Sequence, residues 1–174
     1  LIALDSRGYE IPNDAKWNRD SIIDAVLTFQ NKNGGFGLNS NESADVDLTA
    51  MCIQGLAPYY GTNEKVKTAV DSALAYLKKQ MDRNCDLGTS EGTAQTIIAL
   101  TALKMDPLDE TSGFAKSKAR NLLTALEAYR VDGSGFKHML NDAKVNNMSA
   151  IQAMQALVAY DRYRLAKTAL YDLK

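Results

Sequence analysis

The chain is 174 residues long, with 45% hydrophobic and 24% charged residues, which is typical of one globular domain with its own core. Its formal net charge of −1 provides no basic surface for nucleic acid, so we expect no nucleic-acid partner. No apolar run approaches the roughly 20 residues that a membrane-spanning helix requires, and two cysteines are too few for a disulfide framework.

The first two long helices are expected at 20–31 and about 44–57. Apolar residues at helical spacing mark the first helix. Gly34 and Gly35 end it, because glycine readily adopts the positive φ angles that close a helix. The second helix is expected to begin after Ser43, a good N-cap residue, with two aspartates in its first turn, where the helix dipole favours carboxylates.

Two further pairs of helices follow by the same criteria. The expected elements are a helix capped by Thr62 and Asn63, a helix over 91–104 capped by Ser90, a helix over 117–130, a helix from Asn146 or Asn147 to about Tyr160, and an amphipathic segment over 162–173. No strand pattern competes with these helices. The predicted fold class is therefore all-α.

The first residues of the chain match a later helix end. Residues 1–12 align with 97–107, the end of an expected buried helix. We therefore expect the chain to begin at the tail of such a helix and to be a fragment of a larger protein, with the rest of that polypeptide as a partner.

The chain repeats itself. Residues 22–36 align without a gap with 122–136, and the second helices of each pair align at 49–57, 93–101 and 150–158. A period of about 50 residues indicates an array of helical hairpins. We expect a single domain over 1–174, with repeats at about 14–60, 61–107 and 108–161.

Each hairpin can bury its apolar face only against a neighbouring hairpin. An open solenoid would achieve this, and so would a curved array in which inner helices face each other across an axis. Small residues at Gly55, Ala99 and Ala156, with apolar residues on all sides of the inner helices, favour the curved array.

The repeat motifs resemble a known superfamily. Five motifs are similar to the repeats of prenyltransferases and squalene cyclases: QNKNGGF (30–36), DGSGF (132–136), DVDLTA (45–50), SEGTAQ (90–95) and IQAMQAL (151–157). The resemblance implies an α/α toroid, in which outer helices ring inner ones. It is closest to the non-enzymatic toroid domains of bacterial surface and secreted proteins, which are related to the cobalamin-binding transcobalamin and intrinsic-factor domains. A full toroid has about six hairpins, so three hairpins imply a partial one.

The same resemblance directs attention to catalytic motifs. Class II terpene cyclases use a DxDD motif, of which Asp45 and Asp47 match the first two acids, whereas Leu48 replaces the last. The interpretation that we favour is that these aspartates stabilise a helix N-terminus. Zinc-dependent prenyltransferases need an Asp, Cys and His set, and the chain has only His138, expected in a surface turn, and no D-x-C pair. We expect no metal site, no cofactor and no catalytic residue.

A ligand site on the inner helices is the remaining functional candidate. Three aligned pairs, each four residues apart, would lie near one end of the inner layer: Asp47 with Met51, Glu91 with Gln95, and Met148 with Gln152. Polar groups that converge on a mostly apolar concave surface are typical of ligand pockets. The alternative is that Gln95 and Gln152 hydrogen-bond loop backbone. Tyr60 could belong to an aromatic rim or pack the end of the domain.

These patterns predict a non-catalytic ligand-binding or interaction module of a larger secreted or cell-surface bacterial protein. The resemblance implies the location and suggests a cobalamin-like, glycan or isoprenoid ligand. The alternatives are a terpene cyclase or prenyltransferase-type enzyme that acts on an isoprenoid, and a structural spacer.

Overall fold

A computed structural model describes residues 1–39 and 42–174. Helices dominate the described residues, which confirms the all-α class. The elements are α1 (Ile2–Asp5), α2 (Arg19–Leu27), α3 (Val46–Leu56), the 3₁₀ turn η1 (Ala57–Tyr59), α4 (Glu64–Gln80), α5 (Ser90–Ala102), the 3₁₀ turn η2 (Glu110–Ser112), α6 (Leu122–Glu127), β1 (Arg130–Val131), β2 (Gly135–Phe136) and α7 (Asn147–Arg164).

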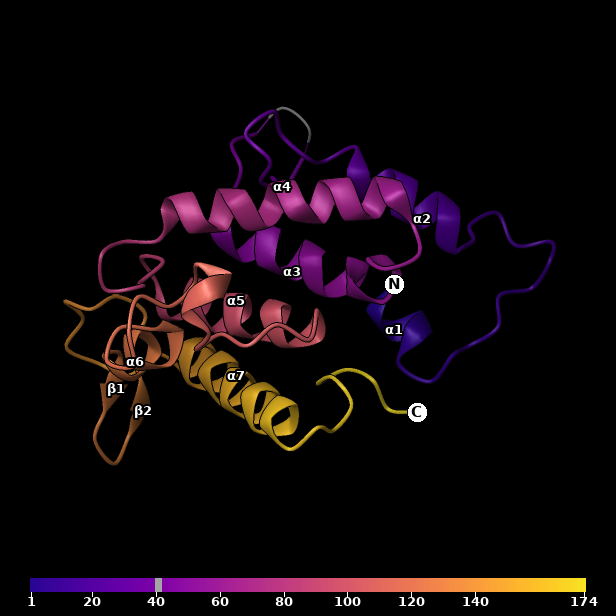
Figure 1. Cartoon of the computed structure of the whole chain (residues 1–174). Coiled ribbons are helices and arrows are strands. Elements are labelled where there is room, and N and C mark those ends of the chain that lie inside the picture. Colours follow the sequence, from indigo (N-terminus) through magenta and orange to yellow (C-terminus); the bar gives the residue numbers. More distant parts are fainter. Residues whose placement is uncertain (40–41) are drawn as a thin grey trace.

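Helices α3, α5 and α7 pack side by side in a row, with α5 in the middle (Figure 1). Helix α4 covers α3 and also contacts α2, and α6 packs against α5. Every residue of α5 from Ser90 to Thr101 is buried, because neighbouring helices cover it on both sides and from behind. A helix that is apolar or small all round is expected at such a position.

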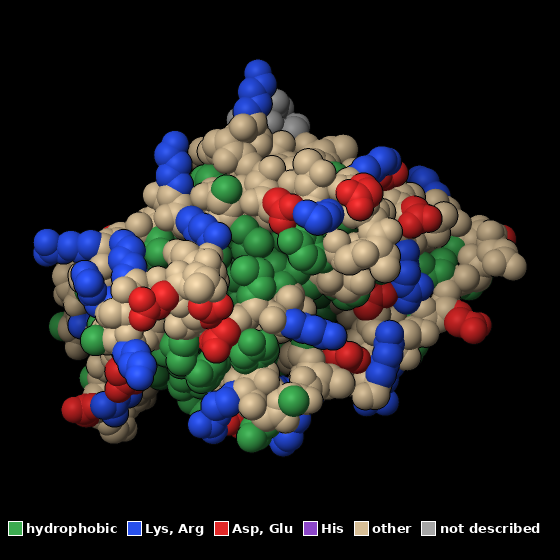
Figure 2. Space-filling view, in the orientation of Figure 1, with side chains coloured by type: hydrophobic (Ala, Val, Ile, Leu, Met, Phe, Trp, Pro, Cys, Tyr) green, Lys and Arg blue, Asp and Glu red, His purple; other side chains and the backbone are tan. Residues whose placement is uncertain are grey.

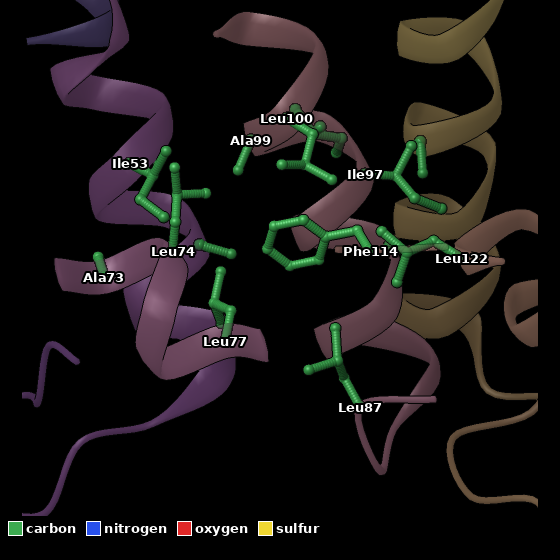
Figure 3. Packing of buried hydrophobic residues seen from close by; sticks show 14 of the residues in the cluster. Ile53, Ala73, Leu74, Leu77, Leu87, Ile97, Ala99, Leu100, Phe114 and Leu122 are labelled. Atoms are coloured by element: carbon green, nitrogen blue, oxygen red, sulfur yellow. The ribbon is translucent and has the colours of Figure 1, made fainter. Parts of the chain in front are cut away.

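The hydrophobic core lies between this row and the covering helices. Figure 3 shows the ring of Phe114, from the loop before α6, directed toward Leu74 of α4. Leu100 and Leu122 belong to the same cluster, and both are fully buried. The loop therefore completes the core between α4 and α5 with one large aromatic side chain.

The N-caps of α3 and α5 differ from the predicted ones by one or two residues. Asp45 rather than Ser43 caps α3, where its side chain accepts a hydrogen bond from the backbone N of Leu48 at 2.9 Å. Thr89 rather than Ser90 caps α5, because Thr89 has the extended backbone of a cap, whereas Ser90 is already helical and buried. Asn63 caps α4 as predicted.

Two of the predicted helices, over 20–31 and 117–130, are longer than the observed α2 and α6. Helix α2 ends at Leu27, before Gln30, whose side-chain N donates to the carbonyl oxygens of Gly34 and Ala69 at 2.8 and 2.7 Å. Helix α6 occupies only part of 117–130. The chain then forms a two-residue antiparallel pair, β1 with β2, where no strand was expected.

Gly34 is required by the turn that follows α2. Its φ is +92°, and a Cβ atom there would lie 2.5 Å from the backbone oxygen of Ser72 on α4. The turn can therefore approach α4 closely only with glycine at this position. This supports the predicted role of Gly34 in ending the helical run, although α2 itself ends earlier.

Of the predicted amphipathic segment over 162–173, only residues 162–164 are helical. Helix α7 continues to Arg164, and residues 165–174 then run back toward α1 without regular helical structure (Figure 1). At the other end, α1 has four residues, and Leu1 packs against the core near Gly55 of α3.

The surface carries charges of both signs. Figure 2 shows hydrophobic side chains exposed between lysines, arginines and acidic residues across one face. Within residues 1–39 and 42–174, no helix combines the length and apolar character needed to cross a membrane.

Candidate functional site

A ladder of three glutamine side chains crosses the row of helices. The Nε2 atom of Gln54 on α3 donates to Oε1 of Gln95 on α5 at 2.7 Å and to its backbone oxygen at 3.0 Å. The Nε2 atom of Gln95 donates to Oε1 of Gln152 on α7 at 2.8 Å. The ladder thus joins the three helices through side chains, and the amide N–H pair of Gln152 remains at its end.

The helices bring these residues together because they pack closely and in parallel. Ala99 of α5 and Ala156 of α7 are fully buried, as small residues between packed helices are expected to be. The C-terminal turns of α3, α5 and α7 meet at one end of the row, where Gly55, Ala102 and Tyr160 line a shared cavity. The glutamines of the three helices therefore lie at similar levels along the helix axes.

A groove of about 600 Å³ lies along this ladder. Its wall includes the three ladder glutamines and three apolar side chains, Met51, Met148 and Ile151. These three are 50%, 63% and 61% exposed, so they offer apolar surface that none of the described residues covers. None of the described side chains that line the groove is charged. The groove therefore suits an uncharged ligand with both apolar and hydrogen-bonding groups.

One helical turn away, toward the N-termini of the same helices, a polar cluster surrounds Glu91. This side chain is 4% exposed, and its Oε1 accepts a hydrogen bond from Oγ of Ser149 at 2.5 Å. Its Oε2 lies 2.8 Å from Nδ1 of His138. That hydrogen bond, with the charge of Glu91, raises the pKa of His138 against the opposing effect of its partial burial. The buried acid thus has a donor on each oxygen.

Asp47 faces the same cluster from α3. Burial raises its pKa to about 6, and the charges of Asp45 and Glu91 add to this, whereas His138 opposes them. Its Oδ1 lies 2.9 Å from the position that a Cβ atom on Gly92 would take. Asp47 is therefore packed against the first turn of α5, where ionisation is unfavourable.

Two predicted site residues lie elsewhere. Asp45 is the N-cap of α3, and its carboxylate is committed to the backbone of Leu48. Tyr60 lies beyond η1, where its OH donates to Oδ1 of Asp71 on the outer helix α4 at 2.7 Å. Tyr60 is therefore not part of the groove, because the 3₁₀ turn after α3 directs it to the outer layer. The groove does contain Met51, Gln95, Met148 and Gln152, whereas Asp47 and Glu91 lie one turn away.

The role of His138 differs from that predicted. It follows β2 in a loop and its side chain is 46% exposed, as expected for a surface turn, but it also pairs with the buried Glu91. The two residues are 47 positions apart, so neither spacing nor periodicity indicated the pair. The backbone oxygen of His138 also accepts from the N of Ser90, which ties the loop to the start of α5.

Sequence reasoning missed Gln54, the first member of the ladder. The repeat alignment placed Met51 opposite Gln95 and Gln152, but the amide comes from three residues later on the same helical face. The signal was present, because Gln54 is a polar residue among the small and apolar residues that follow the first turn of α3.

A second cavity, of about 1170 Å³, lies at the C-terminal ends of the three helices. Asp5 anchors one wall, accepting from Nε of Arg19 at 2.6 Å and from OH of Tyr59 at 2.7 Å. Burial, with the hydrogen bond to Asp5, raises the pKa of Tyr59 to about 12. Ile2, Gln54 and Tyr171 line both this cavity and the groove, so the two spaces adjoin.

The described part of the chain holds no group of three or more His, Cys, Asp or Glu side chains arranged to bind a metal ion. No protein-family model and no curated protein matches the sequence.

Proposed function

We propose that the chain is a non-catalytic module that binds a ligand or partner through the groove across α3, α5 and α7. The observation that carries this proposal is the convergence of Met51, Gln95, Met148 and Gln152, together with Gln54, on one uncharged groove. Exposed apolar side chains beside fixed amide groups are the usual composition of a ligand site.

The wider architecture is part of the proposal. A row of parallel inner helices covered by outer ones would be an arc of an α/α toroid, as in prenyltransferase and squalene-cyclase-like repeats. The motif resemblance supports this, and it also supports a place in a larger secreted or cell-surface bacterial protein. By the same resemblance, cobalamins, glycans and isoprenoids are the ligand classes to test first.

The groove lining favours some of these ligands over others. An isoprenoid diphosphate carries a highly charged group that proteins bind with Lys, Arg or a metal ion. No such side chain lines the groove among the described residues. Neutral ligands therefore fit it better than diphosphates.

A thermal-shift screen tests the binding proposal. The protein is heated with cobalamins, cell-wall glycan fragments, neutral peptides and isoprenoid diphosphates. A ligand at about 100 times its dissociation constant adds about 2.7 kcal/mol to the free energy of unfolding, which raises Tm visibly. The same screen on Gln152→Ala should lose the shift, whereas Gln80→Ala, at the exposed end of α4, should keep it. A shift that survives in Gln152→Ala would place the ligand elsewhere.

An enzyme is the second candidate, and one observation favours it. Asp47 has a pKa of about 6 beside the buried Glu91, and such shifts are frequent at catalytic sites. The structure of this cluster supports a packing role instead, because Glu91 already has two partners. Burial also raises the pKa of Cys52 to about 11, so little nucleophilic thiolate forms there at neutral pH. Turnover of an isoprenoid that is abolished by Asp47→Asn would establish the enzyme.

A structural spacer is the remaining alternative. It predicts that no compound in the screen shifts Tm and that Gln152→Ala changes only stability.

A further inference from the structure

Residues 165–174 form a strap that crosses from α7 back to α1. The backbone N of Leu173 donates to the oxygen of Ser6 at 2.7 Å, which joins the strap to the chain after α1. Arg162 holds its start, donating to the backbone oxygen of Thr168 at 2.9 Å and to its Oγ1 at 2.5 Å. Thr168 Oγ1 in turn donates to the oxygen of Asp172 at 2.9 Å. The strap is therefore fixed by backbone and hydroxyl contacts rather than by helical structure.

Two side chains of the strap lie beside the helices α3, α5 and α7 and pack against the core. Leu170 and Tyr171 are partly buried and pack against the hydrophobic core, whereas Leu165 and Leu173 are more than half exposed. Tyr171 lines the groove together with Ile2 and Gln54, and burial raises the pKa of its phenol. One end of the groove is therefore already in contact with an aromatic side chain from a non-helical peptide segment.

The rest of the groove has the chemistry that such a segment needs. Carboxamide side chains pair with peptide groups, since both offer an N–H donor and a C=O acceptor. The side chains of Gln152 and Gln155 also line the groove, and the N–H pair of Gln152 lies at the end of the glutamine ladder. Met148 and Ile151 beside them provide flexible and branched apolar surface for alternate side chains of an extended peptide.

We propose that the groove binds an extended peptide segment that presents uncharged aromatic and aliphatic side chains, and that the strap is its built-in occupant at one end. This rests on the proposed binding function and names the ligand class for that site. A free peptide must compete with the strap for the contacts of Tyr171. A strap that occupies these contacts about 90% of the time lowers the apparent affinity for a peptide about ten-fold.

The test uses the full chain and a fluorescein-labelled peptide with the sequence of residues 168–173, TALYDL, in a fluorescence-polarisation titration. The double variant Leu170→Ala/Tyr171→Ala removes the Tyr171 ring from the groove and the Leu170 side chain from the adjoining cavity. The matched control is Leu165→Ala/Leu173→Ala, which changes two exposed side chains of the strap. We expect the first variant to bind the peptide at least ten-fold more tightly than the unaltered chain and the control to match the unaltered chain. Addition of Gln152→Ala to the first variant should abolish binding.

A second variant and a second peptide keep the test decisive. Thr168→Ala loosens the strap without changing a groove side chain, so tighter peptide binding is expected there even if the double variant folds poorly. The peptide TASSDL should not bind. Equal affinity of all variants, or binding of TASSDL, would overturn the proposal. If glycan fragments shift Tm in a Gln152-dependent way while no peptide binds, the peptide class is wrong and the binding function stands. If nothing binds, both fail.

Discussion

Replacement of Asp47 by Asn should stabilise the protein at neutral pH. The carboxylate lies in the first turn of α3, where the helix dipole alone would favour it. Burial and the neighbouring acids Asp45 and Glu91 oppose this and raise the pKa to about 6. A side chain of nearly the same shape but without charge removes this unfavourable ionisation.

The magnitude follows from the pKa. A rise from 3.8 to about 6 is about two units, and each unit corresponds to about 1.36 kcal/mol, so the upper bound is about 3 kcal/mol. Asp47 is only partly buried, and solvent screening reduces this value. Loss of the favourable dipole interaction subtracts a further 0.3–1 kcal/mol or so. We therefore expect Asp47→Asn to raise the free energy of unfolding by about 1–2 kcal/mol at pH 7.5.

The stabilisation by Asp47→Asn should depend on pH. Because the folded pKa lies above the unfolded one, the folded state binds the proton more tightly, and stability falls as pH rises from 3.8 to about 6. The difference between Asp47→Asn and the unaltered chain should therefore be small at pH 4, grow up to pH 6 and then remain constant. Urea unfolding followed by circular dichroism measures it.

A matched control occupies the same helical position. Asp20 is the second residue of α2, as Asp47 is of α3, but its side chain is exposed. Asp20→Asn should lose a few tenths of a kcal/mol at pH 7.5, because only the dipole interaction is removed. A loss of stability in Asp47→Asn at pH 7.5, or a gain that does not change with pH, would refute the electrostatic account.

Three further predictions concern the stability of the fold. Gly34→Ala should cost about 2–5 kcal/mol, since it combines a left-handed backbone with a clash against α4, whereas Gly133→Ala, with φ +68° and open space, should cost about 1–2 kcal/mol by urea unfolding. Tyr129→Phe should cost about 1–3 kcal/mol, because the Tyr129 OH donates to Oδ1 of Asp86 at 2.7 Å; no change in the urea midpoint would contradict this. His138→Gln should be less stable than the unaltered chain at pH 6 and nearly equal at pH 9, because the raised pKa of His138 gives stability that is present below pH 6.5 and lost as pH rises through the folded pKa.

The all-α class was predictable because its signals are local and repeated. Small and apolar residues recur on α3, α5 and α7, and Thr62 and Asn63 mark the start of α4. Helix α2 was predicted too long because apolar residues such as Phe29 continue the helical spacing into the turn. There, contacts of Gln30 with α4 determine the backbone instead.

The groove was predictable in part for a similar reason. The repeat alignment indicates which residues of α3, α5 and α7 lie at the same level along the helix axes. It therefore identified Met51, Gln95, Met148 and Gln152. It does not fix how each helix is rotated, so it missed Gln54. Pairs such as Glu91 with His138 depend on how distant loops pack, and no periodicity encodes them.

The methyl groups of the groove methionines report most directly on whether a ligand binds in the groove. The chain has six methionines, of which Met51 and Met148 line the groove and Met139 lies in the exposed loop after β2. Protein labelled with ¹³C at the methionine methyls is titrated with each compound of the thermal-shift panel. We expect at least one compound to shift the Met51 and Met148 resonances saturably while Met139 stays unchanged. A compound that raises Tm but leaves both groove methyls unmoved, or a panel in which none binds, would contradict the account.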